Sequence, residues 1–185
     1  NDLGTGVTRP ENLSNLYPYT GAGAPAPLIK VNATGNALNP RQFEIKINGT
    51  VLSTQTMDFF DYKKVQAVFS ASLIGGGAAN VEVKNLCTLP NDRMSIAQTE
   101  LVYARQFDFG GANNFSFELP ANTAGNYLEI SGFNHGSIGP VFYDLTNGKR
   151  YVGDVTTPSL VKIALEPSSV NRKLLLVSQH SSFPV

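Results

Sequence analysis

Residues 42–51 have the sequence QFEIKINGTV, in which a strand pattern runs into a turn signal. Apolar and polar residues alternate from position 43 to position 47, so every second side chain would lie on one face of an extended strand. Asn48-Gly49 follows, and this dipeptide favours the positive φ angles of a type I′ turn. The apolar pattern resumes at Val51. The stretch therefore predicts a half-buried strand that turns back into a second strand, as in an antiparallel sheet.

The same alternation recurs in the second half of the chain, at Phe115, Phe117 and Leu119, at Leu128 and Ile130, and at Val161, Ile163 and Leu165. Turn signals separate such segments at intervals of about ten residues, which is the spacing of a β-sandwich or barrel rather than of βαβ units. Residues 174–177, LLLV, are apolar throughout and predict a strand that is buried on both faces. On that prediction, Leu175→Ala would cost about 2–5 kcal/mol of stability.

A second hairpin is predicted around Asn147-Gly148. Residues 141–143 lead into the turn and Tyr151-Val152 leads away from it, so the loop should hold about four or five residues. Gly148 is expected in the left-handed conformation, because glycine has no Cβ to oppose a positive φ.

No segment has a convincing helical period. Residues 58–67 are the one helix candidate, but their closely spaced aromatic residues favour a turn followed by a strand. Residues 1–12 lack an apolar period and are expected to fray, and residues 21–27, GAGAPAP, predict a flexible loop. The chain is therefore predicted to be all-β. A boundary within residues 105–111 would divide it into two β units, 1–105 and 106–185, and a single continuous sandwich is the alternative.

Fourteen basic and fourteen acidic residues leave the chain without net charge. This balance argues against a dedicated binder of nucleic acid or of an anionic membrane surface. The basic pairs Lys63-Lys64 and Lys149-Arg150 are isolated and are expected on solvated faces. The apolar runs fall far short of the ~20 residues that span a bilayer, so no membrane span is predicted.

Cys87 is the single cysteine, so no internal disulfide is predicted. A catalytic thiol needs an adjacent base, and only His135 and His180 could supply an imidazole. Nothing in the sequence around Cys87 would activate it. Cys87 is therefore expected to be a small buried hydrophobe, and no catalytic residue is predicted.

Metal binding has weak support in the sequence, because two histidines and one cysteine match no zinc-site spacing. Asp58 with Asp61, or Asn91 with Asp92, could contribute oxygen ligands to a structural calcium site. These residue types are also common in turns, where their side chains bind the nearby backbone, and the turn is the favoured interpretation. No metal or cofactor is predicted.

Exposed aromatic rings could stack on the faces of sugar rings. Two clusters offer such rings, Tyr17 with Tyr19 and Phe59 with Phe60 and Tyr62. Tryptophan is absent, however, and an aromatic content of 10% is ordinary for the core of a β protein. Glycan binding therefore remains an alternative.

Three segments of residues 107–179 stand in a recognisable order, namely LPA with GNYLEIS (119–131), YDLTNGKRY (143–151) and RKLLLVSQ (172–179). They resemble the β-rich region ahead of the peptidase domain in gingipain-type cysteine peptidases, above all in PorU-like sortases of the type IX secretion system of Bacteroidetes. Earlier segments are similar to that family too: NLYPYTGAGAP (15–25), PRQFEIKINGTVL (40–52), MDFFDYKKV (57–65) and DRMSIAQTELVYARQF (92–107). The resemblance implies a jelly-roll-like β-sandwich followed by a second small β-sandwich unit.

The resemblance also implies a non-catalytic accessory module, because the peptidase domain would follow residue 185 and none of its catalytic residues falls in this chain. Such a module would be secreted, or lie at the cell surface or in the periplasm of a Gram-negative bacterium. It would support or position the catalytic domain of its own parent chain and contact other envelope secretion components. The alternative is an independent β-sandwich module that binds a glycan or an envelope protein.

Overall fold

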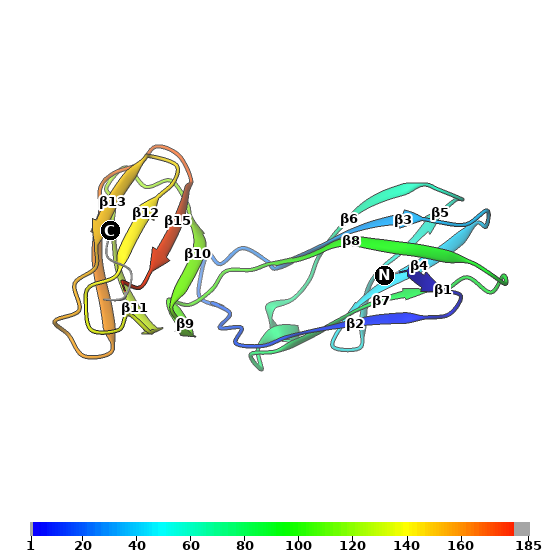
Figure 1. Cartoon of the computed structure of the whole chain (residues 1–185), viewed down its shortest axis with the longest axis horizontal. Coiled ribbons are helices and arrows are strands. Elements are labelled where there is room, and N and C mark those ends of the chain that lie inside the picture. The colour runs from blue at the N-terminus through cyan, green and yellow to red at the C-terminus, as the bar shows by residue number, and fades with distance from the viewer. Residues whose placement is uncertain (1, 180–185) are drawn as a thin grey trace. The chain divides into compact units, whose positions relative to one another are not determined.

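The computed structural model describes residues 2–179 and is all-β, as predicted. The strands form two compact units, the first reaching to Gln106 and the second beginning at Phe107. Each unit consists of two sheets around its own hydrophobic core (Figure 1). No helix within residues 2–179 is long and apolar enough to cross a membrane.

The first unit is a sandwich of two four-stranded antiparallel sheets. In spatial order, one sheet contains β1 (Asp2–Gly4), β8 (Arg93–Val102), β3 (Leu28–Gly35) and β6 (Tyr62–Val68). The other contains β2 (Thr8–Leu13), β7 (Ala79–Asn85), β4 (Arg41–Ile47) and β5 (Thr50–Met57). A short 3₁₀ helix, η1 (Ala71–Ile74), connects β6 to β7. This strand order is that of an eight-stranded jelly roll, which confirms the predicted fold of the first half.

Strand β4 follows the predicted alternation, since Phe43, Ile45 and Ile47 are fully buried and the residues between them are not. Asn48 and Gly49 have φ angles of 48° and 80°, which confirms the type I′ turn into β5. Residues 58–61 form a turn and β6 begins directly after it, as predicted for residues 58–67.

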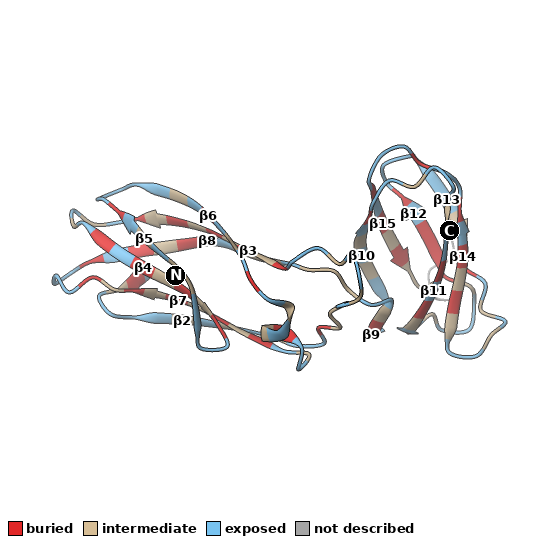
Figure 2. Ribbon diagram, turned by 180° about the vertical axis from the view of Figure 1, so that it is seen from behind, coloured by how far each residue is buried: buried red, intermediate tan, exposed pale blue. Residues whose placement is uncertain are grey.

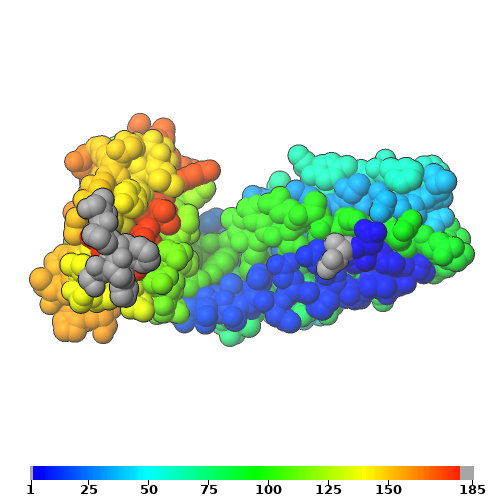
Figure 3. All heavy atoms as spheres, in the orientation of Figure 1, coloured from blue at the N-terminus to red at the C-terminus, as the bar shows by residue number. Residues whose placement is uncertain are grey.

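The prediction that residues 1–12 fray was wrong for residues 2–12, and residue 1 lies outside the described part of the chain. β1 pairs with β8, β2 pairs with β7, and Leu3 is buried in the core. In Figure 3 the blue N-terminal residues lie against green residues from the middle of the chain. Both N-terminal strands are at sheet edges, where backbone hydrogen bonds along one side hold a strand that has no regular apolar period.

The second unit pairs a four-stranded sheet with a three-stranded one. The first contains β10 (Asn114–Leu119), β15 (Arg172–Val177), β12 (Val141–Asp144) and β13 (Lys149–Val152), all antiparallel. The second contains β14 (Leu160–Leu165), β11 (Asn126–Phe133) and β9 (Asp108–Ala112), with β9 parallel to β11. The predicted alternating residues of β10, β11 and β14 face its core, which confirms the small β-sandwich.

Strand β15 corrects the prediction of a strand buried on both faces. Leu174 and Leu176 are fully buried between the sheets, whereas Leu175 and Val177 on the outer face are only half-buried (Figure 2). β15 is a central strand, flanked by β10 and β12. Its apolar sequence goes with this central position, and no other sheet of the described residues covers its outer face. The large loss of stability that was predicted for Leu175→Ala is therefore expected for alanine substitutions of its neighbours in the core.

The turn between β12 and β13 is the predicted four-residue loop, and Gly148 has a φ angle of 64°. A Cβ at this position would meet no atom within 4 Å, so only the backbone conformation restricts the residue. We expect Gly148→Val to cost more than about 1 kcal/mol, because a β-branched side chain opposes positive φ. Gly148→Asn should cost clearly less, since asparagine tolerates this conformation. Chemical denaturation of both variants measures the difference, and equal stabilities would contradict the turn geometry.

Candidate functional site

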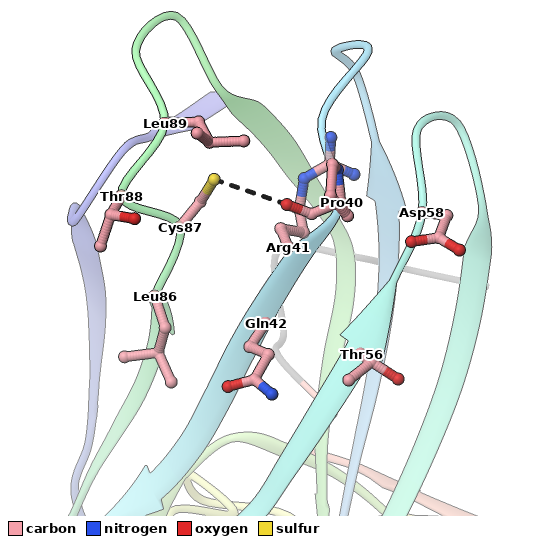
Figure 4. Close-up of a pocket in the computed structure, with 9 residues that line it drawn as sticks. All are labelled: Pro40, Arg41, Gln42, Thr56, Asp58, Leu86, Cys87, Thr88 and Leu89. Carbon is pink, nitrogen blue, oxygen red and sulfur yellow. Dashed lines mark hydrogen bonds between the residues drawn. The ribbon is translucent and has the colours of Figure 1, made fainter.

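A shallow pocket of about 390 Å³ lies at one end of the first unit (Figure 4). It is formed where β4 begins, where β5 ends and where the chain leaves β7. Its lining residues are Pro40, Arg41, Gln42, Thr56, Asp58, Leu86, Cys87, Thr88 and Leu89. The single thiol of the chain thus lies at a concave surface, which makes this pocket the candidate site for nucleophilic chemistry.

Among the described residues, the hydrogen-bond partners of Cys87 do not include a base. Its side chain is buried, as expected, and its Sγ lies 3.6 Å from the carbonyl oxygen of Pro40, to which the thiol donates. Its backbone N–H donates to Oδ1 of Asn85 at 2.9 Å. Neither of these partners is a base that could take the thiol proton, which nucleophilic attack requires.

The two histidines do not complete a site with Cys87 among the described residues. His135 belongs to the second unit, and its Nδ1 is buried without a hydrogen-bond partner in the described part of the chain. His180 lies outside the described residues. The arrangement around Cys87 therefore supports packing of a small apolar side chain rather than covalent catalysis.

A buried ion pair lies beside the pocket. Nε of Arg41 donates to both carboxylate oxygens of Asp92, at 3.0 and 3.1 Å, and both side chains are 0% exposed. The remaining guanidinium nitrogens donate to the carbonyl oxygens of Phe59 at 2.7 Å and Ala37 at 2.9 Å. Arg41 thereby joins β4 to three loops at the same end of the sandwich.

Two further residues make room for this ion pair and complete its hydrogen bonds. Asn85 donates to Oδ2 of Asp92 at 2.7 Å and to the carbonyl of Leu3 at 3.3 Å. Gly35 approaches so closely that a Cβ there would lie 2.0 Å from Nη1 of Arg41 and 1.9 Å from the Phe59 carbonyl oxygen. The network is therefore densely packed and structural, with its polar atoms turned toward one another instead of toward the pocket.

The sequence interpretation missed Arg41 and gave Asp92 a different role. Arg41 falls in phase with the inward residues of β4, and Arg172 likewise falls in phase with the inward residues of β15. Arg172 has its own buried partner, since its Nη1 lies 3.8 Å from Oδ2 of Asp144. An arginine on the apolar face of a strand predicts a buried carboxylate partner, and this signal was available in both units.

The Asp92 carboxyl has a lowered pKa in the folded protein. Burial alone would raise the pKa of Asp92, but hydrogen bonds from Arg41 and Asn85 outweigh burial and hold it below the ordinary value of 3.8. The resulting stabilisation is full above the ordinary pKa and is lost as the pH falls through the lowered pKa of the folded state.

We therefore expect the first unit to lose stability as the pH is lowered from about 5 to about 2. Asp92→Asn, which has no carboxylate to protonate, should show a flatter dependence at a lower overall stability. Urea denaturation of both proteins at a series of pH values measures this. Parallel stability curves for the two proteins would show that Asp92 has the same pKa in the folded and unfolded states.

The two pairs considered for calcium lie in turns. The backbone N–H of Asp58 donates to Oδ2 of Asp61 at 3.2 Å, and Asn91 has a φ angle of 59° beside the buried Asp92. Within residues 2–179 no three or more His, Cys, Asp and Glu side chains gather in a way that could hold a metal ion.

The aromatic residues considered for glycan stacking belong to two separate surfaces. The backbone N–H of Tyr19 donates to the carbonyl of Ala104, which lies just beyond the β8 residue that pairs with Leu28, at the start of β3. Tyr62 pairs with Thr34, at the other end of β3. Six residues of extended strand, about 20 Å, separate these positions. Phe59, Phe60 and Tyr62 are exposed, but they do not form one platform with Tyr17 and Tyr19.

Neither a protein-family model nor a curated protein matches the chain. Among solved structures, the chain is similar to dimeric latent PorU from Porphyromonas gingivalis, with a TM-score of 0.60 and 7% sequence identity. The match covers 96% of this chain and 18% of the PorU chain. The chain therefore has a PorU-like fold, and it corresponds in length to a minor part of that protein.

Proposed function

We propose that this chain is a non-catalytic accessory module of a larger gingipain-type peptidase of the type IX secretion sortase class. Its parent protein would be secreted, or lie at the surface or in the periplasm of a Gram-negative bacterium. The module would support or position the catalytic domain of that parent and contact other envelope secretion components. The main support is the structural match, which spans nearly this whole chain but under a fifth of PorU.

The chemistry around Cys87 supports a non-catalytic role. Its thiol donates to the Pro40 carbonyl, and the buried charges beside the pocket, Arg41 and Asp92, form an ion pair with each other. Within residues 2–179, no hydrogen bond joins Cys87 to a base that could generate a thiolate.

The outer face of the four-stranded sheet in the second unit is consistent with a module that packs against the catalytic domain of its parent. In the strand register, Leu175 pairs with Tyr143. Val141 pairs with Val177 on one side and with Val152 on the other. All five residues are on the face of the sheet that is turned away from the core. The same outer face also carries Glu118, Lys173 and Arg150, so the apolar residues form a patch among charged ones. An apolar patch on an outer face is typical of a surface that another protein domain covers.

Two experiments in the source organism test this proposal. An antibody against residues 1–185 should detect, at the cell surface or in the periplasm, a polypeptide far larger than the 19.9 kDa of this chain. Cys87→Ala in that polypeptide should leave its peptidase activity unchanged. A product of only about the size of this chain would contradict the accessory role, and loss of activity in a normally folded Cys87→Ala protein would contradict the non-catalytic one.

A further inference from the structure

A second groove, of about 260 Å³, lies in the second unit between the edge strands of its two sheets. β13 is the last strand of the four-stranded sheet and β14 the last strand of the three-stranded sheet, and the two lie side by side (Figure 2). The groove is lined by Tyr127, Tyr151, Val152, Asp154, Lys162, Ile163 and Ala164.

The two edge strands begin an antiparallel ladder and then separate. Asp154 and Lys162 exchange two backbone hydrogen bonds of 2.8 Å each, which is a regular antiparallel pair. In a continuous ladder Val152 and Ala164 would form the next such pair. No bridge joins them in the structure, and they line the groove instead.

The register shows which backbone groups point into this gap on the β13 side. The N–H of Gly153 donates to the carbonyl of Pro140, so the alternate residues Tyr151 and Lys149 bond to β12. The N–H and C=O groups of Arg150 and Val152 therefore point away from β12, in the same direction as those of Asp154.

On the β14 side the same reasoning applies to Ala164. Because Lys162 bonds to Asp154, its alternate neighbour Ala164 directs its backbone groups away from β11 and toward β13. No residue of the described chain accepts from or donates to these groups of Arg150, Val152 and Ala164. Both walls of the groove thus present unpaired strand backbone.

The ends and floor of the groove are also defined. The Asp154–Lys162 pair closes one end, and an exposed ion pair between Lys149 and Glu166 crosses the strands at the other. Tyr127 and Val152, which are 63% and 57% exposed, provide apolar surface beside the gap. The hydroxyl of Tyr151 is buried without a hydrogen-bond partner in the described residues, so the floor has a polar group to offer.

We propose that this groove binds an extended peptide by strand addition, with the peptide backbone pairing to β13 and one of its apolar or aromatic side chains against Tyr127 and Val152. Alternate N–H and C=O groups along an edge are recognised by another extended backbone and by little else. The binding is therefore set mainly by main-chain hydrogen bonds, and side-chain selectivity is limited to the position beside Tyr127. This activity is separate from the supporting role and does not depend on it.

The test uses a phage-displayed library of random linear twelve-residue peptides, selected on the chain of residues 1–185. Binders should emerge and should lose affinity about tenfold or more for Val152→Pro, which removes the outward N–H without breaking a bond to β12. Val152→Thr keeps that N–H and nearly the same side-chain shape, so it should lose clearly less affinity than Val152→Pro. Should Val152→Pro fail to fold, Tyr127→Ala provides the second variant, because it removes part of the side-chain contact and leaves the backbone unchanged.

Amide hydrogen exchange on the same complex gives an independent measurement. The amides of Arg150, Val152 and Ala164 should exchange fast in the free protein, and those of Arg150 and Val152 should slow when a selected peptide is added. The amide of Tyr151, which is bonded to β12, should be protected in both states. The proposal is overturned if no binder emerges, if binders are indifferent to both variants, or if the slowed amides lie elsewhere.

Discussion

Replacing Arg41 with alanine is expected to lower the free energy of unfolding of the first unit by about 3–5 kcal/mol. Both side chains of the Arg41–Asp92 pair are fully buried, so the substitution leaves a carboxylate in the core without its partner. It also removes the donors to the carbonyls of Phe59 and Ala37. Chemical denaturation of wild-type and variant chains, followed by a probe in the first unit, measures the loss.

A surface ion pair provides the matched control for Arg41. Lys30 and Glu100 are 2.9 Å apart on neighbouring strands of the same unit, but their side chains are 37% and 40% exposed. Lys30→Met should therefore change stability by less than about 1 kcal/mol. If Arg41→Ala proved no more harmful than Lys30→Met, the buried pair would not hold this end of the sandwich together.

The second large effect is expected at Leu174. Leu174→Ala should cost about 2–5 kcal/mol, because the side chain is completely buried between the sheets of the second unit and its removal leaves a cavity. Leu175→Ala is the control, since it removes the same atoms from the half-buried outer face of the same strand and should cost about 1 kcal/mol or less. A similar loss in both variants would mean that the outer face is as tightly packed as the core.

Local patterns in the sequence were enough to predict most strands and both tight turns. The alternation from Phe43 to Ile47 and the Asn48-Gly49 turn depend on residues that are neighbours along the chain, so the pattern contains the information needed. The short edge strands β1 and β2 could not be predicted in this way, because partners about 65 to 95 residues away hold them through the backbone.

The candidate sites depend still more on distant contacts. Arg41 could be recognised as inward-facing from its phase with Phe43, but its partner Asp92 lies in a loop that only the folded jelly roll brings near. Leu175 and Leu174 are identical in type and adjacent, so the sequence alone could not say which of them faces the core. The groove between β13 and β14 arises where two sheets separate, which is a property of their twist and pairing and has no signature in either strand.

The jelly-roll order of the first unit determines when that unit can fold. β1 pairs with β8, which ends at Val102, so the sheet that contains β1 cannot close until the roughly hundred residues from β1 to the end of β8 have left the ribosome. During that interval β3 also lacks its β8 neighbour, and its alternating apolar residues stay open to other chains. Slower synthesis, or a chaperone that shields β3 until β8 arrives, should therefore raise the yield of folded protein.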